Sequence, residues 1–298
     1  MSILSVKNIS KSYKKQVLCD VNFDINEGEI VGLVGPNGVG KSTLMKIISL
    51  LVSPDSGQVK VCDIDAITSR KEYLKHMSCI IEVPALYEML TGYANINFIR
   101  KINNVSKEHM YDILKFVNIG DMINEKVKNY SLGMKQKLAL GIALLTTPKL
   151  LILDEPNNGL DPQASMELKE LLLRLSRENN MSILISSHIL SDLNKVCSKL
   201  LFLKDAKIID SDIANINLES QNIVLTVANP RVIIESIKTI KNIDNVTIVT
   251  DNKICINVMK DKVASVIQEI TENNISYSNI EIVSDIMDSV YRSVYGGK

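Results

Sequence analysis

The chain has 298 residues, with 34 basic and 34 acidic side chains, and therefore no formal net charge. Domains dedicated to binding nucleic acids usually carry an excess of positive charge, so this balance argues against that class of protein. The length is sufficient for one large domain or two, with a substantial hydrophobic core.

The cysteines and the apolar runs bear on the compartment in which the protein works. Five cysteines are scattered along the chain without a C-x-x-C pair, a usage typical of reduced thiols in the cytosol. The N-terminal residues lack the basic and then apolar layout of a signal peptide. No apolar run approaches the ~18–20 residues needed to cross a bilayer. We therefore expect a cytoplasmic protein that does not cross a membrane by itself.

Strands and helices alternate in the first 210 residues. Apolar and β-branched runs predict strands at residues 3–10, 21–26, 29–35, 53–63, 149–154, 181–187, 199–205 and 207–210. Helical spacing predicts helices at residues 41–51, 135–145, 164–179 and 189–197, and a mostly helical stretch from 72 to 129. This alternation predicts an α/β fold with a largely parallel sheet covered on both faces.

The pattern changes at a polar stretch, residues 211–221, which we interpret as a linker. The remainder reads as β-α-β-β-α-β followed by a helix at residues 284–295, a small α+β unit of ferredoxin-like pattern. We therefore predict two domains, residues 1–212 and 213–298. The second domain shows no cluster of residues typical of a catalytic site. We therefore interpret it as a packing or dimerisation module rather than a catalytic one.

A glycine-rich loop joins the predicted strand at residues 29–35 to the helix at 41–51. Its sequence, GPNGVGKS, fits the phosphate-loop pattern G-x-x-x-x-G-K-[ST], in which backbone N–H groups and a helix N-terminus surround the phosphates. A purely structural glycine turn would not require the Lys-Ser pair. We expect nucleotide to contact Gly35, Pro36, Asn37, Gly38, Val39, Gly40, Lys41, Ser42 and Thr43, with Ser42 also holding Mg²⁺.

Two adjacent acids, Asp154 and Glu155, follow the apolar strand at residues 149–154. Ligands of parallel sheets bind at the carboxyl ends of the strands. Asp154 is placed to hold Mg²⁺ through water, and Glu155 to orient and polarise an attacking water. Taken alone, the pair could equally be a strand that ends in a charged turn.

Three further motifs occur in a fixed order. Residues 129–138 (NYSLGMKQKL) resemble the signature motif of ATP-binding cassette (ABC) ATPases, residues 157–162 (NNGLDP) their D-loop, and residues 185–190 (ISSHIL) their switch histidine. Tyr13 stands where that family has its adenine-stacking aromatic residue. The resemblance covers about residues 3–212, and it implies an ABC-type ATPase domain with a helical subdomain at about residues 84–145.

The resemblance also implies a mechanism. Such cassettes pair head to tail, with each ATP between the phosphate loop of one subunit and the signature motif of the other. Ser131 and Gly133 would then donate to the γ-phosphate across the interface, and Asp161 would report on the opposite site. His188 would contact the γ-phosphate and the attacking water, although a histidine here could also be a capping or core residue. His76 and His109 lack such a context, and we interpret them as surface residues.

Two positions depart from the family pattern. The signature reads Ser131-Leu132-Gly133-Met134, where two glycines and a glutamine are usual, but the key Ser and Gly are present. Glu82 stands where a Mg²⁺-sensing glutamine is usual, which adds a third candidate metal ligand. With a glutamate at this position, the chain resembles the ABC ATPases of bacitracin resistance and lantibiotic self-immunity. It also resembles those of related exporters of cytolytic peptides.

This resemblance implies an ATPase that powers a membrane exporter of antimicrobial or cytolytic peptides. Its partners would be a separate permease, whose coupling helix would enter a cleft near residues 82–95, and a second cassette, either identical or related. The chain would then lie at the inner face of the cell membrane, attached through the permease, with no nucleic acid bound. The alternatives are a soluble ABC ATPase without a permease, or a transporter subunit for another substrate such as a drug or lipid.

Overall fold

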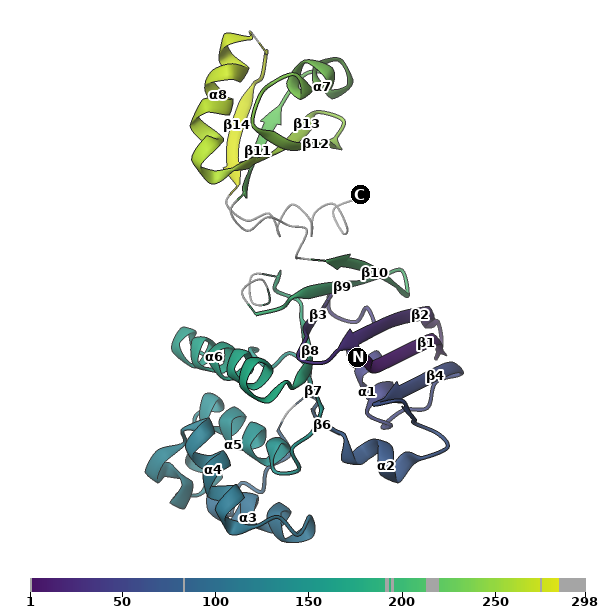
Figure 1. The fold of residues 1–298 in the computed structure, drawn as a ribbon, viewed down its shortest axis with the longest axis vertical. Coiled ribbons are helices and arrows are strands. Elements are labelled where there is room, and N and C mark those ends of the chain that lie inside the picture. The colour runs from purple at the N-terminus through teal and green to yellow at the C-terminus, as the bar shows by residue number, and fades with distance from the viewer. Residues whose placement is uncertain are drawn as a thin grey trace. The chain divides into compact units, whose positions relative to one another are not determined.

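The computed structural model describes residues 2–82, 84–190, 193, 196–212, 220–273 and 275–283 (Figure 1). Contacts divide the chain into two compact units, residues 1–211 and residues 212–298. Each unit has a hydrophobic core of its own. Among the described residues, no helix combines the length and the apolar character that a membrane span requires.

A six-stranded sheet forms the centre of the first unit. Its strands are β3 (Ile30–Val34), β6 (Met77–Ile80), β7 (Leu150–Leu153), β8 (Ser182–Ser187), β9 (Lys199–Lys204) and β10 (Lys207–Asp212). They lie in the order β10-β9-β3-β8-β7-β6, and the pairs β9/β3, β3/β8, β8/β7 and β7/β6 are parallel. Every residue of β3, β7 and β8 is buried, as expected of a parallel sheet covered on both faces.

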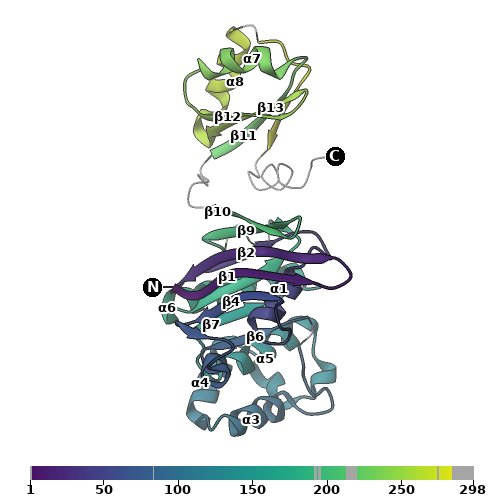
Figure 2. The ribbon, with the colours of Figure 1, turned by 90° about the vertical axis from the view of Figure 1, so that its right-hand side faces the viewer.

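A second, antiparallel sheet holds the other strands of this unit (Figure 2). Its strands are β1 (Ser2–Ser12), β2 (Gln16–Asn26), β4 (Ser56–Val61) and β5 (Ile64–Asp65). The first predicted strands therefore do not join the parallel sheet, because the three residues between β1 and β2 allow only an antiparallel pairing. Helix α1 (Lys41–Ile48) shares one core with residues of both sheets, so it is packed against both.

Helices gather at one end of the first unit (Figure 1). They are α3 (Gly92–Ile102), α4 (Lys107–Val117), the short helices η1 (Gly120–Asn124) and η2 (Val127–Asn129), and α5 (Leu132–Leu144). Helix α6 (Pro162–Asn179) follows β7, and the short helix α2 (Arg70–Lys75) precedes β6. The prediction of a mostly helical stretch from residue 72 was wrong at β6, because a short apolar run shows no period that separates strand from helix.

The described residues of the second unit form a four-stranded antiparallel sheet, two α-helices and one short 3₁₀ helix. Its elements are β11 (Ser220–Thr226), α7 (Pro230–Lys238), β12 (Ile243–Thr250), β13 (Lys253–Met259), η5 (Lys260–Lys262), α8 (Val263–Glu272) and β14 (Asn279–Val283). The strand order β12-β13-β11-β14 is that of a ferredoxin-like unit. The predicted helix at residues 284–295 lies outside the described residues, as do residues 191, 192, 194 and 195 of the one predicted at 189–197.

The separate cores lead to a first prediction. A chain truncated after Asp212 should keep the complete core of the first unit and should still bind ATP with the affinity of the full chain. Circular dichroism and ATP titration of both proteins test this expectation. A truncated chain that is insoluble or unfolded would show that the two units depend on a common core.

Candidate functional site

The loop between β3 and α1 surrounds the Lys41 side chain, which is 5% exposed. Its Nζ donates to the carbonyl oxygens of Gly35 at 2.6 Å and Pro36 at 3.4 Å. Gly40 has φ +122°, and a Cβ on it would lie 2.9 Å from a methyl group of Val17, so this turn requires glycine. The loop thus places a buried ammonium group at the point where α1 begins.

The N-terminus of α1 is itself an anion-binding feature. Its N-cap is Gly40, which offers no side chain to the first N–H groups of the helix. Ser42 and Thr43, in the same first turn, are half-buried. Unsatisfied N–H groups and the helix dipole together favour a negative charge at this end. The arrangement therefore suits a phosphate group, with Lys41 beside it.

The carboxyl end of β7 carries the two acids. Asp154 is 4% exposed, and its Oδ1 accepts a hydrogen bond of 2.6 Å from Ser186 Oγ on β8. The same Oγ accepts from the backbone N–H of Glu155 at 2.9 Å. Ser186 therefore fixes the carboxylate of Asp154 and the backbone of Glu155 together, since both depend on one hydroxyl.

Glu155 joins three parts of the chain. Its Oε1 lies 3.1 Å from Lys41 Nζ, and its Oε2 lies 2.6 Å from His188 Nδ1. Burial alone would raise the pKa of this carboxyl, but hydrogen bonds to His188 and Lys41 and their charges outweigh burial, so its pKa lies below the ordinary value. An ionised carboxylate only accepts, so His188 donates from Nδ1. The result is an anionic carboxylate held between a lysine and a histidine.

A cavity of about 320 Å³ opens beside this carboxylate. It is bounded by Glu155, by His188 and by the loop that follows Glu155, including Asn157 and Gly159. Its lining includes both polar groups and apolar side chains such as Leu160 and Leu193. The cavity gives a water molecule or a phosphate group access to Glu155.

The predicted signature residues lie where helices begin. Ser131 is the N-cap of α5, where its Oγ accepts from Met134 N at 3.3 Å, and Asp161 is the N-cap of α6, where its carboxylate accepts from Ala164 N at 2.8 Å. A Cβ on Gly133 would lie 2.9 Å from the Cβ of Ala164, so glycine allows α5 and α6 to approach. The prediction places these residues across a dimer interface, which a single chain does not test.

Comparison with known proteins decides the family. The ABC transporter family model matches residues 18–158. The lantibiotic transport ATP-binding protein SrtF of Streptococcus pyogenes is 42% identical over 208 residues, which cover 70% of this chain and 89% of that protein. The chain belongs to the ABC transporter family. Its cassette, the first unit, binds ATP and hydrolyses it.

Other relatives agree with this assignment. The bacitracin transport ATP-binding protein BcrA of Bacillus licheniformis is 36% identical over 70% of this chain and 69% of its own length. A solved structure of an ATP-binding subunit of an ABC transporter superposes with a TM-score of 0.65 at 30% identity, covering 72% of this chain and 91% of its own. The cassette MJ0796, solved as a dimer bound to ADP and Pi, superposes with a TM-score of 0.63 at 25% identity, over 70% of this chain and 98% of its own.

Two predicted site residues of the cassette are exposed. Tyr13 follows β1 and is 60% exposed, with Lys11 Nζ 5.5 Å from its ring centroid. The side chain of Glu82 is 63% exposed, and its Oε1 lies 2.5 Å from Lys46 Nζ on α1. The hydrogen bond to Glu82 is the main reason why the pKa of Lys46 is raised, and the charge of Asp154 adds to it.

The residues present fit a magnesium ion only in combination with nucleotide. The described residues contain no group of three or more His, Cys, Asp or Glu side chains that could hold a metal. Ser42 and Asp154 nevertheless supply the oxygen ligands that Mg²⁺ prefers, and this ion commonly completes its shell with phosphates and water. A cassette metal site of this kind therefore needs the nucleotide to be complete.

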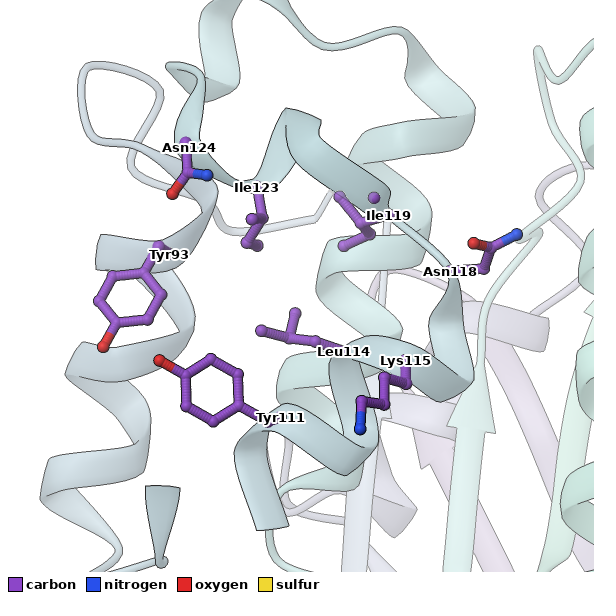
Figure 3. A pocket seen from close by; sticks show the side chains of 9 residues that line it. Tyr93, Tyr111, Leu114, Lys115, Asn118, Ile119, Ile123 and Asn124 are labelled. Atoms are coloured by element: carbon purple, nitrogen blue, oxygen red, sulfur yellow. The ribbon is translucent and has the colours of Figure 1, made fainter. Parts of the chain in front are cut away.

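A larger cavity of the cassette, about 680 Å³, lies away from these residues, among α3, α4 and η1. Figure 3 shows the hydroxyl groups of Tyr93 and Tyr111 turned toward each other at its edge. Their hydrogen bond is the main reason why the pKa of Tyr111 is raised. Neither the phosphate loop nor Glu155 or His188 lines this cavity, so we do not assign the nucleotide to it.

Sequence reasoning missed three residues of the site. Ser186 and Lys46 are described above, and the third is Gln136 of α5, which is buried and donates from Nε2 to Pro156 O at 3.2 Å. Lys46 follows Ser42 by four residues, a spacing that places both on one face of a helix. For Ser186, a polar residue near the end of a buried strand was the available signal.

Ser186→Ala should slow ATP turnover by roughly tenfold, because an unpaired buried group costs ~1–3 kcal/mol and here two groups lose one partner. Ser182, at the other end of β8, is equally buried and donates to Asn26 O at 2.9 Å. Ser182→Ala is therefore a matched control that should lower thermal stability without changing kcat. If both variants turn over ATP at the same rate, Ser186 has no positioning role.

Proposed function

We propose that this chain is the ATPase subunit of a membrane exporter of peptide antibiotics or cytolytic peptides. The observation that carries the ATPase mechanism is the contact of Glu155 with both Lys41 and His188 beside an open cavity. Relatives named for lantibiotic and bacitracin transport support the substrate class.

The site residues predicted from the sequence then have the following roles in hydrolysis. Lys41 moves from the loop carbonyls to the β- and γ-phosphates, and the backbone from Gly35 to Gly40 surrounds them. Ser42, Asp154 and Glu82 would hold Mg²⁺, which would supply positive charge against the phosphates. Glu155 orients and polarises the attacking water, and a carboxylate held ionised is suited to accept its proton.

His188 and the signature residues complete the site. His188 donates from Nδ1 to Glu155, and a protonated imidazole would also donate from Nε2 to the γ-phosphate. Ser131 accepts a hydrogen bond as an N-cap, so its own hydroxyl proton stays available for the γ-phosphate of a partner cassette. Gly133 keeps the start of α5 open to that phosphate, Asp161 lies at the interface, and Tyr13 stacks on the adenine.

An apolar groove supports the permease as partner. It has a volume of about 500 Å³ and is lined by β6, residues 84–86, α3 and α5. Leu51 and Leu74, two of its lining residues, are exposed. Beside it, the exposed rings of Tyr87 and Phe98 meet edge to face with centroids 5.8 Å apart. A short helix of a permease would bury these side chains. In the sequence, residue 82 comes shortly before residues 84–86, which line the groove.

The test is a complementation experiment in the host cells of this protein. Cells that lack the chain should become sensitive to a lantibiotic or to bacitracin, and the wild-type gene should restore survival whereas Glu155→Gln should not. The tagged chain should also purify from membranes with one strongly apolar protein. Unchanged survival would overturn the peptide substrate, and recovery without any membrane protein would favour an ABC ATPase that acts without a permease.

A further inference from the structure

Lys46 has no role in the mechanism above, yet it lies beside the proposed metal site. It follows Ser42 by four residues on α1, so both side chains leave the same face of the helix. Glu82 follows the end of β6 by two residues, and Ile80 of β6 is paired with Leu153 of β7. Glu82 and Asp154 therefore lie at the same edge of the sheet, and Lys46 reaches this edge from the helix.

The contact between Lys46 and Glu82 is close, with 2.5 Å between Nζ and Oε1. Both side chains are partly exposed, and exposed ion pairs contribute little to the stability of a fold. Glu82 also has φ +63°, a backbone conformation that is uncommon for residues other than glycine. Stability of the fold therefore does not account for this arrangement.

Two of the three carboxylates of the site each contact a lysine. Lys41 at the start of α1 pairs with Glu155, and Lys46 in its last turn pairs with Glu82. The third carboxylate, Asp154, accepts from Ser186. A neutral glutamine at position 82 would need no cation, whereas a bare carboxylate there would repel the phosphates of ATP. Lys46 is the cation that contacts this glutamate.

We propose that Lys46 is the permanent counter-ion of Glu82. The pair that faces the phosphates of ATP then carries almost no net charge. This inference rests on the proposed position of Glu82 beside the nucleotide. Lys46 is thus a positioning residue, which keeps the carboxylate available to Mg²⁺ without a loss of nucleotide affinity. Its contribution is largest when no Mg²⁺ is present, because the metal otherwise separates the carboxylate from the phosphates.

The experiment is a titration of the purified full chain with ATP, in EDTA and again in excess Mg²⁺. Lys46→Met should weaken ATP binding in EDTA by roughly five- to tenfold, the effect of one unscreened charge a few ångströms away. The loss should shrink in Mg²⁺. Adding Glu82→Gln to Lys46→Met should restore the affinity in EDTA to near that of the wild type, because both charges of the pair are then absent.

Two results would overturn the proposal. An affinity in EDTA that Lys46→Met leaves unchanged would show that the pair does not face the nucleotide. A double variant as weak as Lys46→Met would show that Lys46 binds ATP by itself. Lys75→Met, which breaks an exposed ion pair of 2.6 Å with Glu72 on α2, is the matched control and should leave the affinity unchanged. The titration involves neither permease nor peptide, so it can succeed or fail independently of the proposed export function.

Discussion

Glu155→Gln should stop ATP turnover while ATP still binds. The amide has the size of the carboxylate, but it cannot accept the proton of the attacking water, and loss of such a group costs ~10²–10⁴-fold in rate. It also removes the negative charge that Lys41 and His188 hold in place at 3.1 Å and 2.6 Å. Trapped ATP should then hold two cassettes together. Phosphate release and light scattering with ATP measure the two effects.

A matched control separates this effect from a general loss of charge. Glu167 lies on α6, where it forms a half-buried ion pair with Lys137 of α5, away from the phosphate loop. Glu167→Gln should leave both turnover and dimerisation as in the wild type. Near wild-type phosphate release from Glu155→Gln would remove Glu155 from the role of general base, whatever the state of the dimer.

The fold was predictable where the sequence pattern has a single interpretation. β3 and β7 are short apolar runs that end at a glycine and at two acids, and β8 is an apolar run that ends in two serines. The structure has buried strands at all three positions. β6 was missed because its four residues carry no readable period, and its identity depends on pairing with β7, which lies about seventy residues later in the chain. Which strands join which of the two sheets also depends on pairing between distant segments, and no local sequence pattern shows this pairing.

In the candidate site, too, the sequence identifies some residues and only the fold identifies the others. Motifs with fixed spacing identify Lys41, Asp154 and Glu155, because the chemistry of phosphate binding requires those residue types in that order. Lys46 belongs to no such motif, and Ser186 lies in residues 185–190 without a role that the motif assigns to it. Their partners lie 36 and 32 positions away along the chain. The sequence shows that a serine and a lysine are present, but only the folded chain shows which carboxylates they meet.

Lys41→Ala should weaken ATP binding by roughly 10- to 100-fold, the range expected when a hydrogen bond to a charged group is lost. Lys41 is buried, and it is the cation that the loop holds beside the N-terminus of α1. In the structure its Nζ is satisfied by the carbonyls of Gly35 and Pro36 and by Glu155. The phosphates of bound ATP would replace these partners of Lys41 Nζ. Only an anionic ligand can replace them favourably.

The same substitution has a second consequence, which distinguishes a phosphate ligand from a structural lysine. Lys41→Ala removes one of the two side chains that hold Glu155, so turnover at saturating ATP should fall as well. Lys7→Ala breaks an exposed pair with Asp24 at 2.9 Å on the antiparallel sheet and serves as the control. Isothermal titration with ATP and a melting curve without it should show lost affinity with little change in Tm. Equal ATP affinity in wild type and Lys41→Ala, with or without a shift in Tm, would contradict the assignment of the loop to phosphate.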